Sequence, residues 1–216
     1  MIYQSVNQAV LQRIPSCARS LLDIGCGGGV FGAAVKAVMP CSVVGVTYSD
    51  AEAVLARQHL DRVEVADLNH FDPAGLGRFD CIVCSHVLEH LLDPQQLLSR
   101  LRDCLAPGGT LLVALPNVLF WKQRIQFLRG RFRYTDGGLM DRTHIRFFDW
   151  DSAESLVRES GFEVRERAAD GIFPLSRIVG QPLSKWIDQR ALSQFPGVFG
   201  VQFVLVATTA GHSTVP

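Results

Sequence analysis

The chain has 216 residues, of which 48% are hydrophobic and 19% charged, so it can bury a sizeable core and fits a single domain over residues 1–216. Its 21 basic and 21 acidic residues give a formal net charge of zero, which excludes an argument from total charge for a nucleic-acid partner. No apolar run reaches the roughly 20 residues of a membrane span, and the first residues lack a secretory pattern. We therefore expect a cytoplasmic protein with no membrane span.

Short apolar runs alternate with amphipathic segments, which indicates an α/β sheet wound with helices on both faces. The expected strands are 21–24, 42–46, 63–65, 79–84 and 110–115, and the expected helices are 31–38, 51–59 and 94–104. After residue 148 the pattern resumes with a helix that Asp149 caps and that ends before Gly161. Strands at 162–168 and 199–208 are expected to follow.

The six cysteines do not form a metal-binding pattern. Cys81 and Cys84 are three residues apart in a strand-like run, so their side chains point to opposite faces of a sheet. We expect buried free thiols and predict no metal site.

A glycine-rich run lies where the first strand turns into the first helix. Gly25, Gly27 and Gly29 alternate after Asp23, and such a turn needs unusual backbone dihedrals and allows a ligand to lie against the chain. The dinucleotide pattern G-x-G-x-x-G is not met, because position 30 is Val.

This run resembles the first motif, acidic-x-G-x-G-x-G, of the class I methyltransferases that use S-adenosylmethionine. Residues 63–68 are similar to the family's third-strand segment, 79–90 to its fourth strand and following turn, and 105–110 to its L-x-P-G-G turn. The resemblance implies a doubly wound, Rossmann-like sheet, mostly parallel with an antiparallel C-terminal strand. It also implies S-adenosylmethionine as the cofactor.

The resemblance implies a set of cofactor-binding residues along the ends of the strands. These are Asp23, Gly25, Gly27, Gly29, Thr47, Tyr48, Asp67, Leu68, Ser85 and His86. In the family, Asp67 would accept a hydrogen bond from the adenine amino group. Thr47 departs from the commonest pattern, in which Asp or Glu binds both ribose hydroxyls, so Glu52 or a backbone carbonyl would complete the contact. The alternative for Thr47 is an ordinary strand-end residue.

Residues 117–148 interrupt the alternation and are interpreted as an acceptor-binding insertion, because ligands of such sheets bind beyond the carboxyl ends of the strands. No regular secondary structure is expected there. This stretch and the closing run 195–207 resemble bacterial methyltransferases of polysaccharide and O-antigen biosynthesis and, more distantly, the MetW proteins of methionine biosynthesis.

His144 is the candidate general base, because an imidazole can take a proton at cellular pH. Neighbouring arginines are expected to lower its pKa and keep it neutral. The alternative is a histidine that only ties the insertion to the core. We expect His86 and His90 to shape the cofactor pocket and Glu89 to be a helix-start residue favoured by the helix dipole.

Residues 117–148 include seven basic residues but only two acidic ones, and aromatic residues are interleaved with them. This excess predicts an anionic small-molecule acceptor, with nucleic acid a weaker candidate. The expected acceptor contacts are Trp121, Tyr134, Arg142 and Arg146. The alternative is a solvated helix face whose arginine stems cover apolar surface.

These observations favour an enzyme that methylates a hydroxyl of a small molecule or sugar. The runner-up changes the acceptor to a carboxylate or a nitrogen of a small metabolite. A third possibility is a protein with the methyltransferase fold that acts through a partner enzyme. A nicotinamide-dependent oxidoreductase is disfavoured by Val30 and Thr47.

Overall fold

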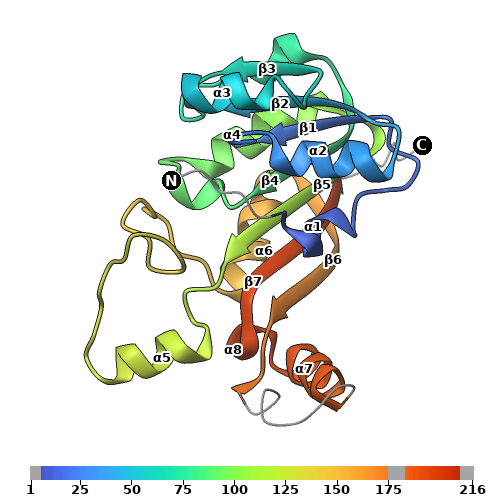
Figure 1. Cartoon of the computed structure of the whole chain (residues 1–216). Helices are drawn as coiled ribbons and strands as arrows, with labels where there is room; N and C mark the ends of the chain where they lie inside the picture. The colour runs from blue at the N-terminus through green and yellow to red at the C-terminus, as the bar shows by residue number, and fades with distance from the viewer. Residues whose placement is uncertain (1–5, 175–182, 210–216) are drawn as a thin grey trace, which may run out of the picture.

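The computed structural model describes residues 6–174 and 183–209, which form a seven-stranded sheet of order β3-β2-β1-β4-β5-β7-β6 (Figure 1). The strands are β1 (Ser20–Ile24), β2 (Ser42–Thr47), β3 (Arg62–Val65), β4 (Phe79–Ser85), β5 (Leu105–Pro116), β6 (Phe162–Gly171) and β7 (Gly200–Thr209). Strands β1 to β5 are parallel to one another. Strand β7 lies between β5 and β6 and is antiparallel to both. The predicted fold class is confirmed.

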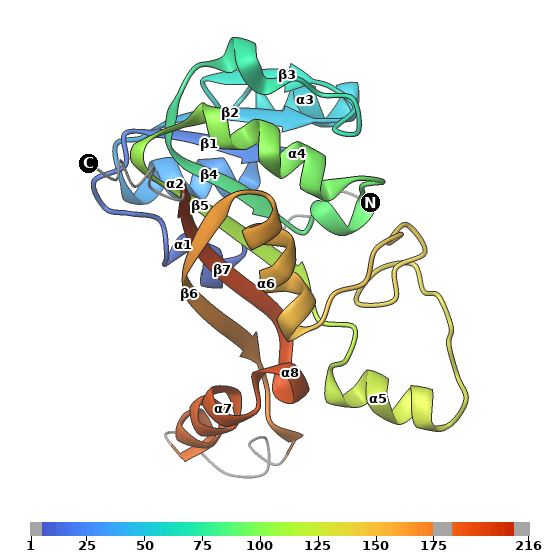
Figure 2. The ribbon, with the colours of Figure 1, turned by 180° about the vertical axis from the view of Figure 1, so that it is seen from behind.

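Helices cover both faces of the sheet. Helices α1 (Gln8–Leu11), α2 (Val30–Val38) and α3 (Asp50–Ala56) lie on one face, and α4 (Pro94–Leu101) and α6 (Trp150–Glu159) on the other (Figures 1 and 2). Three short 3-10 helices, η1 (Pro73–Leu76), η2 (Leu88–His90) and η3 (Arg102–Cys104), join these elements. None of the helices in the described residues is long and apolar enough to cross a membrane.

Two layers of buried apolar side chains pack against the two faces. Ile82 and Cys84 belong to the layer beneath α4 and α6, whereas Cys81 and Val83 belong to the layer beneath α1 to α3. This alternation confirms that Cys81 and Cys84 point to opposite faces. All six cysteines are free, but Cys17 is exposed, so the expectation of burial is wrong for that thiol.

The winding direction of the sheet reverses between β1 and β4. From β1 the chain winds outward through β2 to β3 and then returns to β4 beside β1. In sheets of this kind the ligand crevice lies outside the carboxyl ends of the strands at such a switch point. The ends of β1, β2 and β4 therefore define where the site is to be sought.

Asp149 caps α6 as predicted. Its side chain accepts a hydrogen bond from the backbone N–H of Ser152, and the Ser152 hydroxyl accepts one from the backbone N–H of Asp149. Gly161 follows the helix with a φ of 87°, which also agrees with the prediction.

Residues 117–148 leave the sheet at the end of β5 and return at the start of α6 (Figures 1 and 2). They contain α5 (Trp121–Leu128), so the expectation of no regular structure is wrong there. None of the residues of α5 is buried, and a helix without a buried face shows no apolar period in its sequence. The remaining residues are irregular, with isolated bridges between Asn117 and Phe148 and between Thr135 and Asp141.

Helices α7 (Leu183–Gln194) and α8 (Pro196–Phe199) precede β7, and neither was predicted from the sequence. Among the residues of α7 only Ser184 is buried, so this helix also lacks an apolar stripe against the core.

Candidate active site

The glycine turn between β1 and α2 lies at the switch point. Gly25, Gly27 and Gly29 have φ values of 79°, 51° and 82°. A Cβ on Gly25 would lie 2.8 Å from Cγ2 of Val87, and one on Gly29 would lie 2.9 Å from Cα of Ala56. These two glycines are required by packing. A Cβ on Gly27 would meet no atom within 4 Å, so this position leaves the open space that a ligand against the turn needs.

Asp23 places a carboxyl directly before this turn. It is 3% exposed, and its Oδ2 has no hydrogen-bond partner among the described residues. Burial raises the pKa of Asp23 to about 7. A cation beside the carboxyl would favour its ionised form. The α-ammonium of S-adenosylmethionine is such a cation, so this uncompensated buried oxygen fits the expected cofactor.

Thr47 ends β2 beside the glycine turn and is 2% exposed. Its hydroxyl donates a 2.7 Å hydrogen bond to Oε2 of Glu52, which lies in the first turn of α3. The backbone N–H groups of Gly25 and Cys26 both donate to the carbonyl of Val46, at 2.9 Å. Glu52 thus brings a carboxylate to the strand end where the sequence has threonine. Ribose recognition by this pair stays a prediction.

The ends of β2 and β3 are joined where adenine is predicted to bind. The N–H of Ala66 donates to the carbonyl of Thr47 at 2.9 Å. Asp67 is exposed, and its Oδ1 accepts from the backbone and side-chain nitrogens of Asn69, which hold its pKa below the ordinary value. Tyr48 is 77% exposed, whereas Leu68 is buried. This edge offers an ionised acceptor and an exposed ring to a ligand.

The turn after β4 carries Ser85 and His86. The Ser85 hydroxyl accepts a hydrogen bond from Nδ2 of Asn7 at 3.1 Å. His86 is the one non-glycine residue with positive φ among those described, at 53°. Its Nε2 lies 2.8 Å from Oε1 of Gln202 and its Nδ1 3.4 Å from Oε1 of Glu89. Burial would lower the pKa of His86, but Glu89 and Gln202 outweigh it, and the net shift is upward.

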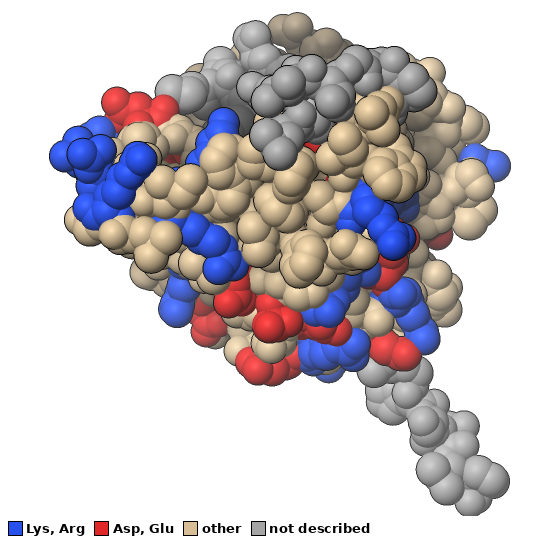
Figure 3. Space-filling view, turned by 90° about the horizontal axis from the view of Figure 1, so that it is seen from below, with Lys and Arg blue, Asp and Glu red and all other residues tan. Residues whose placement is uncertain are grey.

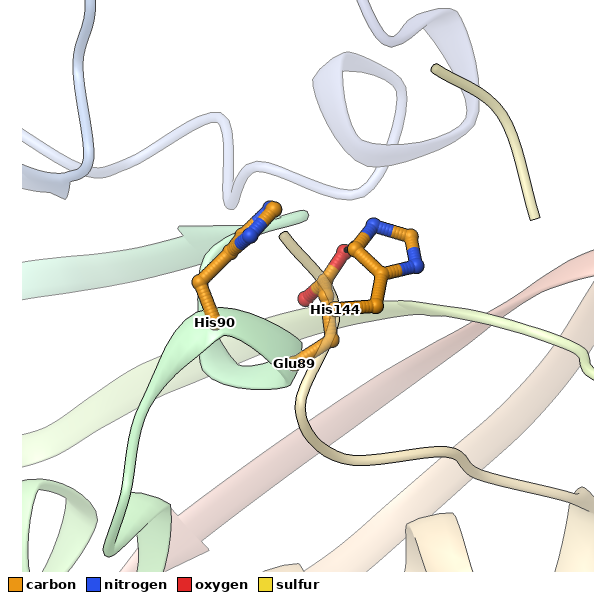
Figure 4. A group of neighbouring side chains, drawn as sticks. All are labelled: Glu89, His90 and His144. Atoms are coloured by element: carbon orange, nitrogen blue, oxygen red, sulfur yellow. Dashed lines mark ion pairs between the residues drawn. The ribbon is translucent and has the colours of Figure 1, made fainter. Parts of the chain in front are cut away.

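Glu89, His90 and His144 form a cluster beside this turn (Figure 4). Glu89 is fully buried, and its Oε1 lies 3.9 Å from Nε2 of His144. The rings of His90 and His144 meet edge to face, with centroids 4.8 Å apart. The sequence predicted only a helix-start position for Glu89 and not its place in this cluster. The available signal was the group of three titratable residues, His86, Glu89 and His90, directly after a buried strand.

Backbone hydrogen bonds fasten the end of the 117–148 segment to η2. The N–H groups of Ile145 and Arg146 both donate to the carbonyl of Glu89 at 3.0 Å. Nδ1 of His90 lies 3.1 Å from the carbonyl oxygen of Thr143. His144 is therefore held next to η2, which follows the carboxyl end of β4.

His144 is 5% exposed, and its Nδ1 lies 3.3 Å from the carbonyl oxygen of Leu139. Because a carbonyl only accepts, Nδ1 carries the hydrogen and Nε2 keeps a free lone pair. Burial lowers the pKa of His144, against the opposing charge of Glu89. The predicted downward shift of the pKa is confirmed, but the predicted cause is wrong. Burial of the imidazole lowers the pKa, and the neighbouring arginines are not among the causes.

The predicted acceptor residues are spread over the segment. Trp121 has a buried Nε1 without a hydrogen-bond partner in the described part of the chain, and Tyr134 is 52% exposed with its ring edge-on to Phe132. Arg142 pairs with Asp136 at 2.8 Å, and Nη2 of Arg146 donates to the carbonyl of Leu92. Both arginines therefore already have partners, and their contact with an acceptor stays a prediction.

A pocket of about 380 Å³ lies between α5 and the irregular part of the segment. Its lining is Phe120, Lys122, Gln123, Gln126, Arg131, Arg133, Thr135, Leu139 and Met140. Lys and Arg side chains gather at the left edge of the view in Figure 3, on the side of α5. Leu139, whose carbonyl holds the His144 ring, is part of the pocket wall. The pocket thus has cationic side chains and the residue that supports the His144 ring in its wall.

The sheet order, the glycine turn and the open space before Gly27 define a class I methyltransferase that uses S-adenosylmethionine. The chain belongs to the methyltransferase-domain family, whose model matches residues 4–167. It is an enzyme of this class, and S-adenosylmethionine is its cofactor.

Relatives agree with this assignment. The chain is 25% identical over 174 residues to a ubiquinone biosynthesis O-methyltransferase of Thiobacillus denitrificans, covering 77% of this chain and 74% of that protein. It is 32% identical over 159 residues to a Mycobacterium tuberculosis protein named as a probable S-adenosylmethionine-dependent methyltransferase. That match covers 72% of this chain and 54% of the relative, so the chain spans about half of that protein's length. The crystal structure of a methyltransferase from Archaeoglobus fulgidus shares the fold, with a TM-score of 0.63, 19% identity and coverage of 89% of this chain and 86% of that one.

The open space at Gly27 predicts that Gly27→Asn abolishes cofactor binding without unfolding the protein. Asparagine tolerates positive φ, and its side chain would fill the space before the turn. Calorimetry with S-adenosylmethionine and thermal unfolding measure the two effects. Gly108→Asn is the matched control, because Gly108 also has positive φ and open space but lies near the amino end of β5. Parental affinity in Gly27→Asn would contradict the assignment.

The raised pKa of Asp23 predicts that the protein without cofactor loses stability as pH rises from about 4 to 7. In that range folded Asp23 keeps a proton that the unfolded chain has released, so rising pH favours unfolding. A shift of about three pKa units corresponds to about 4 kcal/mol as an upper bound. Asp23→Asn should remove this loss in urea unfolding at pH 5 and pH 8, whereas the exposed control Asp50→Asn should not. Unchanged pH dependence in Asp23→Asn would show that the carboxyl is ionised in the folded state.

Proposed function

We propose that this enzyme methylates a hydroxyl group of a small anionic molecule, such as a phosphorylated sugar or a phenol that carries a carboxylate. The observation that carries the proposal is the orientation of His144, whose Nδ1 hydrogen is held by the carbonyl of Leu139. Its Nε2 is therefore an acceptor within the segment that lies over the carboxyl end of β4. The O-methyltransferase named among the relatives supports the same type of acceptor.

A hydroxyl needs a base because its ordinary pKa keeps it protonated at neutral pH. When bound, S-adenosylmethionine supplies the methyl group as an electrophile, so the chain needs no nucleophile of its own. His144 Nε2 takes the hydroxyl proton as the oxygen becomes bonded to carbon. The buried Glu89 carboxylate, 3.9 Å away, then stabilises the imidazolium.

The anionic part of the acceptor binds, in this proposal, in the pocket beside α5. Lys122, Arg131 and Arg133 line it, and none of the three has an acidic partner among the described residues. Guanidinium groups bind phosphate and carboxylate through paired hydrogen bonds, which gives the pocket its preference for anions. Leu139 belongs both to the pocket wall and to the support of His144, and this shared residue is the reason for placing the acceptor beside the base in this proposal.

The base assignment predicts that His144→Gln lowers turnover about 10²- to 10⁴-fold on a hydroxyl acceptor. The acceptor is found first by screening phosphorylated sugars and phenolic acids for release of the demethylated cofactor by the parental enzyme. Cofactor affinity, measured by calorimetry, should stay parental. His59→Gln, at an exposed position after α3, is the matched control. Near-parental turnover in His144→Gln would instead indicate an acceptor that is already ionised, such as a carboxylate.

The pocket assignment predicts that Arg131→Gln and Arg133→Gln raise the KM for the acceptor and leave kcat nearly unchanged. A hydrogen bond to a charged group is worth about 1.5 to 3 kcal/mol, so each change should raise KM about 10- to 100-fold. Arg129→Gln is the matched control, because Arg129 is exposed and does not line the pocket. Equal KM values in all three variants would contradict the proposal that the anionic part of the acceptor binds in this pocket.

A further inference from the structure

Glu89 presents a buried carboxyl group whose two oxygens, Oε1 and Oε2, lack hydrogen-bond partners among the described residues. Its side chain is 0% exposed. The nearest ring nitrogens are Nδ1 of His86 at 3.4 Å and Nε2 of His144 at 3.9 Å, both measured to Oε1. Buried carboxylates persist where donors or cations compensate their charge. A cation between these groups would supply the compensating charge that no hydrogen bond provides to Glu89.

The two histidines of the cluster are oriented as metal ligands usually are. His90 Nδ1 lies 3.1 Å from the carbonyl oxygen of Thr143, and His144 Nδ1 lies 3.3 Å from that of Leu139. Each Nδ1 therefore carries the hydrogen, and each Nε2 keeps a free lone pair. Histidines that bind metals characteristically donate their other ring N–H to such an acceptor, which fixes the tautomer and the direction of the ring.

Asp141 supports this arrangement from behind. Its Oδ1 accepts hydrogen bonds from the backbone N–H and the hydroxyl of Thr143, at 2.8 and 2.7 Å. These bonds fix the residue whose carbonyl holds His90. Asp141 and Thr143, which are not themselves candidate ligands, thus help to hold the His90 ring in place.

One candidate ligand atom from each of Glu89, His90 and His144 lies within 4.8 Å of the other two (Figure 4). Zinc bonds of about 2.0 to 2.2 Å at tetrahedral angles place neighbouring ligand atoms about 3.3 Å apart. Side-chain rotations that move these atoms inward by about an ångström would therefore bring three ligands to zinc, and a water molecule would take the fourth position. Two imidazoles and one carboxylate suit zinc and its transition-metal neighbours, whereas magnesium prefers oxygen ligands.

We propose that Glu89, His90 and His144 bind a divalent cation of the zinc class and that the bound cation inhibits methyl transfer. Binding rests on the geometry of the cluster alone. Inhibition also rests on the proposed function, because the cation and the hydroxyl proton would use the same lone pair of His144 Nε2. A chain with the cation bound is then a methyltransferase without its base.

Equilibrium dialysis of the chelator-stripped full chain against Zn²⁺ tests the site without cofactor or acceptor. We expect one Zn²⁺ per chain, at least tenfold weaker binding in both His90→Ala and Glu89→Gln, and parental binding in His70→Ala, an exposed histidine outside the cluster. Thermal unfolding shows that each variant is folded, and Glu89→Gln keeps the shape of the side chain if His90→Ala does not fold. Mg²⁺ should not compete for the site.

Co²⁺ used in place of Zn²⁺ distinguishes this cluster from the free cysteines. Ligation by nitrogen and oxygen gives d–d absorption without a thiolate-to-metal charge-transfer band. That band, the absence of bound Zn²⁺ in the parental chain, or equal binding in parent and both cluster variants would each overturn the proposal.

Turnover in the presence of Zn²⁺ tests inhibition. We expect parental turnover to fall with the same midpoint as binding, and turnover of His90→Ala to be insensitive to Zn²⁺ at concentrations that inhibit the parent. Stoichiometric binding without inhibition would uphold the site and overturn both its inhibitory role and the assignment of His144 as the base. Inhibition without binding at the cluster would overturn the site and leave the base assignment standing.

Discussion

The carboxyl end of the sheet is organised by the turn between β1 and α2, where Gly25 and Gly29 lie too close to neighbouring residues to carry side chains. A Cβ on Gly25 would collide with Val87, and one on Gly29 would collide with the backbone of Ala56. Gly45 faces the same constraint from the neighbouring strand, because its Cβ would lie 2.6 Å from Sγ of Cys26. The end of β1 is therefore packed directly against β2, α3 and the turn after β4. Close packing of this kind transmits small displacements rather than absorbing them.

This packing sets the distance between the cofactor turn and the Glu89 cluster. Val87 rests on Gly25, and Glu89 follows only two residues later in the same turn. His86 enters the turn with a left-handed φ of 53°, a conformation that costs a non-glycine residue of order 1 to 3 kcal/mol and is kept only where the surroundings enforce it. The carbonyl of Glu89 then anchors Ile145 and Arg146. The contact of Val87 with Gly25 and the hydrogen bonds of the Glu89 carbonyl thus fix the position of His144 relative to the glycine turn.

The sheet was predictable because burial imposes a period on the sequence, whereas α5 and α7 were not. In β4, Cys81 to Cys84 are all fully buried between two helical layers, and such a strand reads as a continuous apolar run. Both of these helices lack that constraint, since α5 buries none of its residues and α7 only Ser184. In such helices the pattern of apolar residues does not distinguish a helix from a loop.

The site shows the same division. The glycine turn lies in one short run of sequence, so its spacing could be matched to a motif, and Glu52 was within reach as the neighbour of Thr47. The cluster of Glu89, His90 and His144 is assembled from two segments that are far apart in the chain. Each of the three residues could be picked out in the sequence, but their proximity follows only from the fold. No local spacing could therefore indicate that a buried carboxylate faces the predicted base.

The corrected cause of the pKa shift of His144 changes what controls its protonation. Exposed arginines act through solvent, where their charges are screened within about 8 Å at physiological ionic strength. Arg142, moreover, is offset by its pair with Asp136, and both of these side chains are largely exposed. Desolvation of the buried imidazole is not screened by salt, and it is the larger influence on its pKa. The packing of the 139–146 segment on Glu89 therefore controls how far the pKa of His144 lies below its ordinary value.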